Sequence, residues 1–414
     1  MNKKKNLTIE GSRLWTSIMQ MAQIGKTDKG GCNRQALTDL DRQGRDLFVK
    51  WCEQANCSIR IDKMGNIFAR RAGRNNNLSP VMMGSHLDTQ PTGGKFDGVY
   101  GVLAGLEVIR SLNDLDYTTE RPLEVAVWTN EEGTRFPPSM LASGVFAGAF
   151  DLEYGLSRSD SEGLTVGGEL KRIGYDGSDK VGGQDIFSFF EIHIEQGPVL
   201  EEEKIDIGIV TDAQGLMWYD VTIQGQEAHA GPTPMLLRKD ALLGAGRIIA
   251  EVNKLAVLNG PHACGTVGSM NVFPNSRNVI PGRIDMTIDL RHPDRDTLDD
   301  MHTTLQEVIK KIASKNGLEI EIERISHYYP VHFDESCIEA VRIASEECGV
   351  SAREIVSGAG HDACYISRVA PTSMIFIPCV DGISHNEIED AKPEWITTGA
   401  NVLMRTVLQK ACIT

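Results

Sequence analysis

Short apolar runs that flank an amphipathic stretch are the feature that most restricts the fold of this chain. Residues 81–84 (VMMG) and 123–129 (LEVAVWT) are short and apolar, as buried strands are. Residues 99–112 between them carry apolar side chains at helical spacing. A strand, a helix and a second strand in this order predict a βαβ unit with parallel strands. We therefore expect an α/β domain with a mixed, largely parallel sheet and helices on both faces.

The middle third of the chain has a different pattern. Strands are expected at 218–224, 265–270, 283–290 and 318–325, and helices at 241–257 and 298–314. The order β-α-β-β-α-β is typical of a ferredoxin-like α+β domain. We therefore predict an α/β domain formed by residues 1–212 and 330–414, into which a second domain, residues 213–329, is inserted. The Gly/Ser-rich stretch 155–183 fits either an ordered excursion or a lid.

Composition disfavours several kinds of partner. The 414 residues carry a net charge of −15, which disfavours binding to nucleic acid or anionic membranes. No stretch approaches the ~18 apolar residues of a membrane span, and the basic start MNKKKNLTIEGSRLW has no apolar segment of a signal peptide. Nine widely spaced cysteines without a CxxC pair are typical of free thiols in a reducing compartment. We therefore expect a cytoplasmic protein.

Three histidines and two acidic residues stand in short segments rich in glycine or acid. They are His86 in GSHLDT, Asp97 in GGKFDGVYGV, Glu132 in TNEEGTRF, His193 in HIEQGP and His385 in GISHNE. Imidazole and carboxylate together are ligands for Zn, Mn, Ni or Co rather than for Ca or Mg. Five ligands are too many for one catalytic ion with an open position, but they suit two ions that share a carboxylate and activate a water. With Glu131 beside Glu132 as a candidate proton carrier, we predict a two-metal amidohydrolase.

Some of these residues have simpler explanations when each is taken alone. Asp97 fits a helix N-cap, because a helix is expected directly after it. His193 lies in an apolar strand, where a histidine is more often part of the core, and His385 fits a surface loop. The joint occurrence of all five residues favours the metal site.

The neighbouring carboxylates have expected positions as well. Glu131 and Glu132 follow an apolar strand, and we expect them on opposite faces of extended chain, one facing a metal and the other a water. An exposed acidic loop is the alternative. We expect the Asp88 carboxylate to accept the second N–H of the His86 imidazole and so fix its tautomer. A simple turn stabilised by Ser85 and Asp88 is the alternative there.

In this order, these segments resemble the M20 family of metallopeptidases and amidases. The narrower resemblance is to its amidase branch, which contains N-carbamoyl-L-amino-acid hydrolases, β-ureidopropionases and allantoate amidohydrolases. It covers nearly the whole chain, from about Arg13 to the last helix. Its most specific strings are GSHLDTQPTGGKFDGVYGV, TNEEGTRF, HIEQGPVLE, EAHAGPTPM, SRNVIPG, DLRHP, SGAGHDA and ISHNE.

The resemblance implies a role for each candidate residue. The ligands of two divalent ions would be His86 and His193 on one ion, Glu132 and His385 on the other, and Asp97 on both. Glu131 would act as general base and then as general acid. His229, in EAHAGPTPM, would hold the carbonyl oxygen as negative charge develops.

The resemblance also implies how substrate is held. The residues involved would be Gln196, Asn278, Arg291 and the backbone near Gly360. An arginine can bind a substrate carboxylate through two hydrogen bonds, although Arg291 also fits a surface ion pair with Asp289 or Asp294. The inserted domain would form a homodimer, so that part of each site comes from the other subunit.

The expected reaction is hydrolysis of the ureido C–N bond of an N-carbamoyl-L-amino acid or N-carbamoyl-β-alanine, releasing the amino acid, ammonia and carbon dioxide. Allantoate, which also has a ureido group beside a carboxylate, is the alternative substrate. Trp218 weakly favours an aliphatic substrate, unless it belongs to the core. The string HIEQGP disfavours an aminoacylase or dipeptidase. A non-catalytic dimeric binding protein is disfavoured because Glu131 and all five ligands are present.

Overall fold

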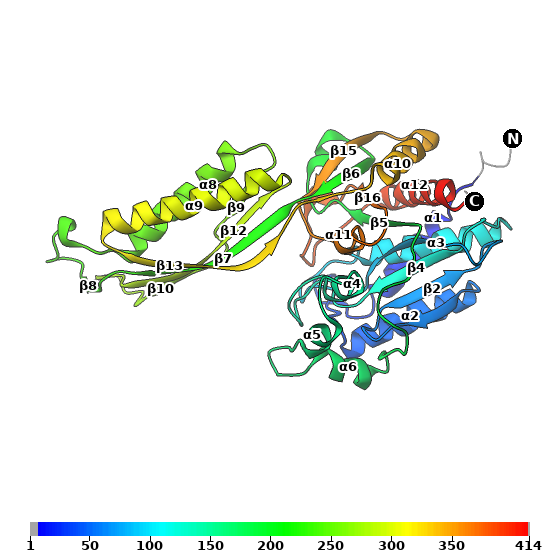
Figure 1. The fold of residues 1–414 in the computed structure, drawn as a ribbon, viewed down its shortest axis with the longest axis horizontal. Coiled ribbons are helices and arrows are strands. Elements are labelled where there is room, and N and C mark those ends of the chain that lie inside the picture. Colours follow the sequence, from blue (N-terminus) through cyan, green and yellow to red (C-terminus); the bar gives the residue numbers. More distant parts are fainter. Residues whose placement is uncertain (1–6, 413–414) are drawn as a thin grey trace. The chain divides into compact units, whose positions relative to one another are not determined.

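The computed structural model describes residues 7–412, so the first six residues of the basic N-terminus lie outside it. The chain forms two compact units (Figure 1). Unit 1 contains the chain up to Thr211 and again from Phe333, and unit 2 is Asp212–His332.

Unit 1 is built on a mixed sheet. Within the described residues the sheet has nine strands in the order β1-β2-β4-β3-β5-β16-β6-β14, with β15 paired to β6. Their bounds are β1 Ser58–Ile61, β2 Ile67–Arg71, β3 Val81–His86, β4 Leu123–Trp128, β5 Ser188–Ile194, β6 Ile207–Ala213, β14 Val331–His332, β15 Ala352–Ser357 and β16 Thr372–Ile377. The central strands β4, β3, β5 and β16 are parallel, while antiparallel pairs extend the sheet on both sides. The predicted α/β fold is confirmed.

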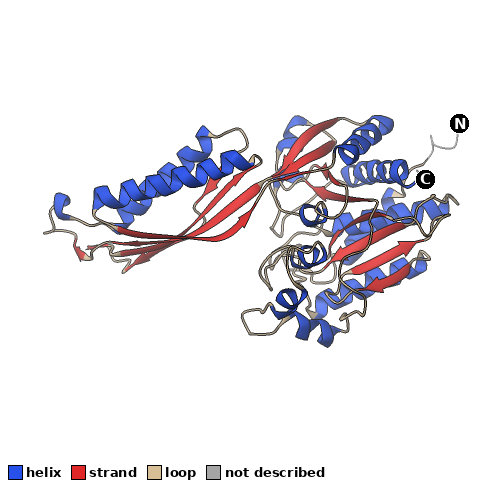
Figure 2. Cartoon of the chain, viewed as in Figure 1, coloured by secondary structure: helices blue, strands red, loops and turns tan. Residues whose placement is uncertain are grey.

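Helices cover both faces of this sheet (Figure 2). They are α1 Gly11–Met21, α2 Asp39–Gln54, α3 Val99–Asp114, α4 Leu141–Phe146, α5 Leu152–Ser157, α6 Val166–Ile173, α7 Val199–Glu203, α10 Glu335–Cys348, α11 Asp362–Ile366 and α12 Pro393–Ala411. On β5, Ile192 packs against Gly399 of α12, whereas the next side chain, Glu191, accepts a hydrogen bond from the backbone N–H of Ala363 in α11 at 2.8 Å. Successive strand side chains point to opposite faces, so both faces are covered.

The stretch 155–183 is an ordered excursion of unit 1. It contains the end of α5 and the helix α6. Arg135 lies between Asp160 and Glu169 of this stretch, with nitrogen–oxygen distances of 3.1 and 2.8 Å. These partly buried ion pairs attach the excursion to the loop that follows β4.

The strand ends of unit 1 bring the candidate residues together. His86 is the last residue of β3, His193 is the residue before the last of β5, and Glu131 follows the end of β4 by a few residues. Because parallel strands end at the same edge of a sheet, their following loops meet there. Gly98, just before α3, has φ +66° and lies under the imidazole of His86, where a Cβ would collide with the ring. Only glycine allows this close approach.

Unit 2 has the two helices and the long strands predicted for the inserted segment, together with short strands that the predicted order β-α-β-β-α-β did not include. Its elements are β7 Gly215–Gln224, β8 Ala228–His229, the 3-10 helix η2 Met235–Leu237, α8 Ala241–Leu258, β9 Cys264–Thr266, β10 Met270–Phe273, β11 Val279–Ile280, β12 Arg283–His292, α9 Arg295–Asn316 and β13 Glu319–Tyr328. Its antiparallel sheet has the order β10-β12-β7-β13, with β9 also paired to β12. The continuous strand expected at 265–270 is wrong: two short strands pair separately with β12, and Gly268 lies in the break between them.

One face of the unit 2 sheet carries the core. Met217, Tyr219, Val221 and Ile223 alternate along β7 and pack in one buried cluster with apolar side chains of α8 and α9. Trp218 points to the other face and is 43% exposed. The core position considered for Trp218 is therefore wrong, and the side chain is available to a ligand or partner.

Between residues 7 and 412, no helix combines the length and the apolar character that crossing a bilayer requires. All nine cysteines are free.

Candidate metal centre

The five candidate ligands lie together in unit 1 as two overlapping groups. His86, Asp97 and His193 form one group, and Asp97, Glu132 and His385 form the other. In each group the ligand atoms lie within 4.8 Å of one another.

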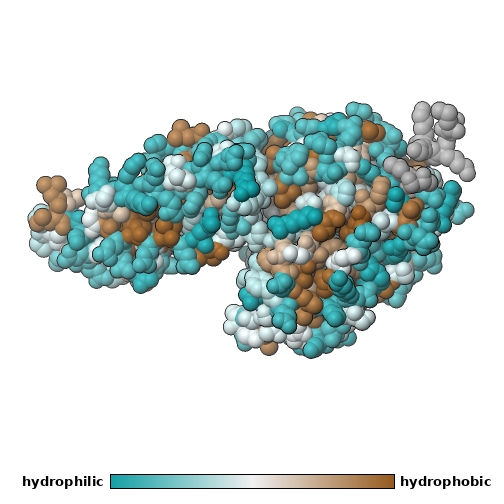
Figure 3. Space-filling model, viewed as in Figure 1, coloured by the Kyte–Doolittle hydropathy of each residue, from teal (hydrophilic) through white to brown (hydrophobic). Residues whose placement is uncertain are grey.

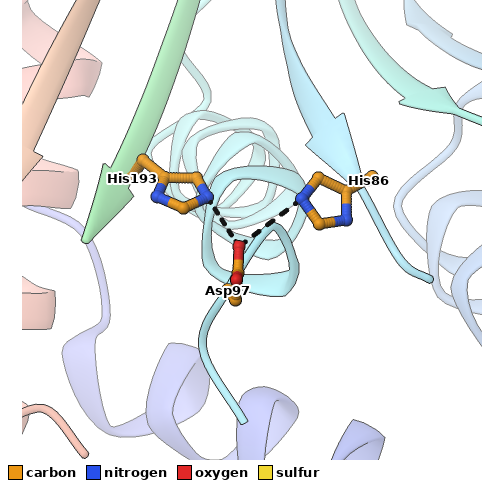
Figure 4. Close-up of side chains that lie close together, drawn as sticks. All are labelled: His86, Asp97 and His193. Atoms are coloured by element: carbon orange, nitrogen blue, oxygen red, sulfur yellow. Dashed lines mark ion pairs between the residues drawn. The ribbon is translucent and has the colours of Figure 1, made fainter. Parts of the chain in front are cut away.

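Asp97 belongs to both groups and divides its oxygens between them. Its Oδ1 is 3.6 Å from Nε2 of His86 and 3.0 Å from Nε2 of His193 (Figure 4). Its Oδ2 is 3.2 Å from Nε2 of His385. A carboxylate can bridge two cations by presenting one oxygen to each. The geometry of Asp97 fits this arrangement.

The two buried histidines are oriented as metal ligands. Nδ1 of His86 lies 2.8 Å from the backbone carbonyl oxygen of Asp88, and Nδ1 of His193 lies 2.9 Å from that of Ile194. With each Nδ1 directed at a carbonyl oxygen, the Nε2 atom of the ring faces Asp97 and is the atom available to a metal. His385 differs, because its side chain is 53% exposed. Solvent therefore reaches the second group at His385.

The role expected for the Asp88 carboxylate is wrong. The His86 ring donates to the backbone oxygen of Asp88 and not to its side chain. The carboxylate turns instead towards the loop after β4, where Oδ1 accepts the backbone N–H of Glu131 at 3.3 Å and Oδ2 that of Glu132 at 3.2 Å. Asp88 thus positions the two glutamates.

Glu131 and Glu132 were expected on extended chain, and this expectation is wrong. The strand β4 ends at Trp128, and Asn130 has φ +59°. This turn directs the two side chains to different partners. Glu131 Oε2 lies 3.5 Å from Nε2 of His86, and Glu132 Oε2 lies 3.5 Å from Nε2 of His385. Glu132 also accepts hydrogen bonds from the backbone and side-chain amides of Gln90 at 3.0 and 2.5 Å.

Burial shifts the pKa values of the carboxylates at the site. Burial and the charge of Asp97 raise the pKa of Glu132 to about 7. Burial also raises the pKa of Glu131 well above its usual value. Burial opposes ionisation of Asp97 as well, but hydrogen bonds from the three histidines lower its pKa well below the usual range. Bound cations stabilise the ionised form of buried carboxylates that lie close together. The arrangement of these residues suits the binding of such cations.

The residues expected to bind substrate are divided between the units. In unit 1, the side-chain amide of Gln196 donates to Asp97 Oδ2 at 3.0 Å and to Ser384 Oγ at 3.1 Å, so it contacts the shared ligand. Gly360 lies against Met140, and a Cβ there would come within 2.8 Å of the Met140 methyl carbon.

The other three lie in unit 2, outside the unit that contains the five candidate ligands. His229 is exposed on β8, and Asn278 is exposed in a loop where its backbone oxygen accepts the N–H of Ala230 at 2.9 Å. Arg291 makes the ion pair considered as its alternative role, with Nη2 2.8 Å from Asp289 Oδ2.

Two further buried residues at the site were not recognised in the sequence. The His361 ring lies 4.6 Å from the His193 ring and its Nε2 is 3.1 Å from Ser357 Oγ. Glu389 accepts hydrogen bonds from the backbone that carries Asp97. Both stand inside or just after quoted strings, SGAGHDA and ISHNE, so their proximity to the motifs was the available signal.

Comparison with known proteins agrees with this geometry. The model of peptidase family M20/M25/M40 matches residues 82–409, a segment that includes all five candidate ligands. The chain belongs to this family. It is 52% identical to an N-carbamoyl-L-amino-acid amidohydrolase of Rhizobium meliloti over 98% of both chains. It is 34% identical to the allantoate amidohydrolase of Bacillus subtilis over 97% of both.

A solved structure supports the fold over the same length. The crystal structure of an amidase of the hydantoinase/carbamoylase family from Burkholderia multivorans is 59% identical in sequence and superposes with a TM-score of 0.96, covering 98% of this chain and 99% of that one. The resemblance to the amidase branch of M20 is thus confirmed.

Proposed function

We propose that this enzyme hydrolyses the carbamoyl C–N bond of N-carbamoyl-L-amino acids. The observation that carries the proposal is the pair of ligand groups joined by Asp97, in a chain 52% identical along its length to an N-carbamoyl-L-amino-acid amidohydrolase. N-carbamoyl-β-alanine, which has the same ureido group and a carboxylate one carbon further away, is included in the substrate class. We also propose a cytoplasmic location, supported by nine free cysteines.

Two divalent ions complete the proposed site. His86 and His193 would hold one, Glu132 and His385 the other, and Asp97 both. The mixed nitrogen and oxygen donors suit Mn, Ni, Co or Zn. When bound, such ions lower the pKa of a water and polarise a carbonyl group.

The residues of the chain then supply the proton transfers. Glu131 is buried beside His86 and is not needed as a ligand in either group. Its raised pKa suits a carboxylate that takes a proton from the attacking water and returns it to the leaving nitrogen. Gln196 fixes Asp97 from the side of Oδ2.

We also propose that unit 2 forms a homodimer and contributes to catalysis. Exposed apolar side chains support an interface: Leu243, Val257 and Leu258 on α8, and Met270 and Phe273 on the edge strand β10. Apolar side chains also gather at the end of this unit that carries β8 (Figure 3). We propose that His229 of one subunit holds the developing oxyanion in the site of its partner, and that Asn278 and Arg291 bind substrate with it, together with Gln196 and the backbone at Gly360.

Allantoate amidohydrolase activity is the second candidate. It is favoured by the 34% identity to the B. subtilis enzyme along nearly the full chain. We rank allantoate second because the sequence identity to the R. meliloti enzyme is higher, at 52%.

A substrate panel tests the proposal. Purified enzyme supplied with Mn is expected to turn over N-carbamoyl-L-amino acids faster than allantoate, measured as ammonia release. The matched N-carbamoyl amino acid amide is expected to be a poor substrate, because it lacks the carboxylate that Arg291 would bind. Faster turnover of allantoate would establish the second candidate. Equal turnover of acid and amide would remove Arg291 from the substrate site.

Mixing of two inactive variants tests the contribution of the partner subunit. His229→Ala is expected to lower kcat by about 10²–10³-fold, as loss of an oxyanion donor does. Glu131→Gln inactivates the other part of the site. Random exchange of subunits creates heterodimers with one intact site, so activity is expected to rise towards about a quarter of the parent value. If exchange is demonstrated by mass but activity does not return, His229 does not act in the partner's site.

A further inference from the structure

Glu389 is a buried carboxylate between two loops that carry candidate ligands. It is 1% exposed, and it follows the His385 loop in sequence. Its Oε1 accepts the backbone N–H groups of Phe96 and Asp97 at 3.0 and 3.1 Å, and its Oε2 accepts the hydroxyl of Ser384 at 2.7 Å. One side chain therefore connects the loop of Asp97 to the residue beside His385.

The surroundings of Glu389 are built for this contact. Gly94 lies so close that a Cβ at this position would overlap the carboxylate of Glu389. Ser384, which donates to Glu389, also receives a hydrogen bond from Gln196, and Gln196 donates to Asp97 Oδ2 as well. Asp97 is thus held through its backbone by Glu389 and through its side chain by Gln196. The hydrogen bonds of Glu389 hold the backbone of Asp97 and the side chain of Ser384, which precedes His385 in the second group. The His385 side chain is half exposed, so less protein surrounds it than surrounds His86 and His193.

We infer that Glu389 is a positioning residue that holds Asp97 and His385 at the mutual distance required by the second ion. This inference rests on the proposed two-ion site. Glu389 itself touches neither group of ligand atoms in the proposed coordination. It acts through three hydrogen bonds, which fix the two loops before any ion binds. The ion held by Glu132 and His385 therefore depends on Glu389 more than the ion held by His86 and His193.

Two substitutions separate geometry from charge. Glu389→Ala removes both acceptor oxygens and with them all three hydrogen bonds. Glu389→Gln keeps an oxygen for the two backbone N–H groups and offers its NH₂ to Ser384 Oγ, which can accept as well as donate. If positioning by hydrogen bonds is the role of Glu389, the glutamine variant retains it without the negative charge.

The test measures Mn bound per chain and its affinity, by elemental analysis and competition with a chelator. The parent is expected to bind two ions, and Glu389→Ala to bind the weaker one about 10–100-fold less tightly, as for other residues that orient metal ligands. Glu389→Gln is expected to stay close to the parent. Ser384→Ala, which removes one of the three donors, is expected to weaken the same ion by a smaller factor, and it serves if Glu389→Ala does not fold.

Glu107 provides a matched control. It is fully buried and also connects two distant segments, through the N–H of Glu10, the hydroxyl of Ser111 and the guanidinium of Arg13. Glu107→Ala is expected to lower the melting temperature and keep both ions. A parent that binds no metal would refute the two-ion site itself. Two ions bound normally by Glu389→Ala, an equal loss in Glu389→Gln, or an equal loss in Glu107→Ala would each overturn the inference on Glu389.

Discussion

Removal of divalent metal with a chelator is expected to abolish turnover of N-carbamoyl amino acids, and added Mn, Ni or Co is expected to restore it. The physical reason lies in the two ligand groups, which gather the carboxylates and imidazoles typical of metal ligands around Asp97. Asp97→Ala is expected to be the most damaging ligand substitution, because it takes one oxygen from each ion. Activity and metal content, measured on the same samples, check both expectations.

Glu107→Ala, described above, is the control for loss of a buried carboxylate. It is expected to retain metal-dependent turnover. Normal turnover by protein that elemental analysis shows to be metal-free would refute the metal-dependent mechanism. Two ions bound by Asp97→Ala with parental affinity would refute the shared ligand.

Glu131→Gln is expected to lower kcat by about 10²–10⁴-fold, the usual effect of losing a well-placed proton-transfer group. Both ions are expected to remain bound, because neither ligand group includes Glu131. The amide of glutamine is nearly isosteric with the carboxylate but does not accept a proton at neutral pH. Single-turnover kinetics and metal analysis give the two readouts.

Glu132→Gln is the natural comparison, since it changes the adjacent residue in the same way. It is expected to reduce metal occupancy, because Glu132 belongs to the second group and lies 3.5 Å from His385. The roles of the two glutamates are reversed if Glu131→Gln loses metal while Glu132→Gln keeps both ions and loses only kcat.

Much of the fold follows from local sequence patterns. The apolar runs at β3, β4 and β5 predict buried parallel strands, because their hydrophobicity is continuous and not alternating. The pattern failed at residues 265–270, where one continuous strand was expected and two short strands, β9 and β10, are found. Gly268 lies there between two strands that pair separately with β12, and pairing over distance is not encoded in a local run of residues.

The site was predictable as far as strand ends determine it. His86 and His193 lie at the ends of parallel strands, so their proximity follows from the sheet. The partners of Asp88 and Glu389 depend instead on the path of loops, including the left-handed backbone at Asn130 and His385. Such conformations are rare for residues other than glycine, and a local pattern does not reveal them. The carboxylate of Asp88 was therefore expected at the wrong partner, and Glu389 was not recognised.

Because the Asp88 carboxylate holds the loop after β4, we expect the identity of the bound metals to affect the acid–base chemistry of the proposed site. Glu131 and Glu132 are consecutive residues, and both of their backbone N–H groups are fixed by the two oxygens of Asp88. The proposed base and a proposed ligand thus lie on one short segment of backbone that is held by a single carboxylate. An ion of larger or smaller radius that displaces Glu132 would then be expected to displace Glu131 as well. Exchange of one metal for another would then alter the aim of the proton carrier as well as the Lewis acidity of the site.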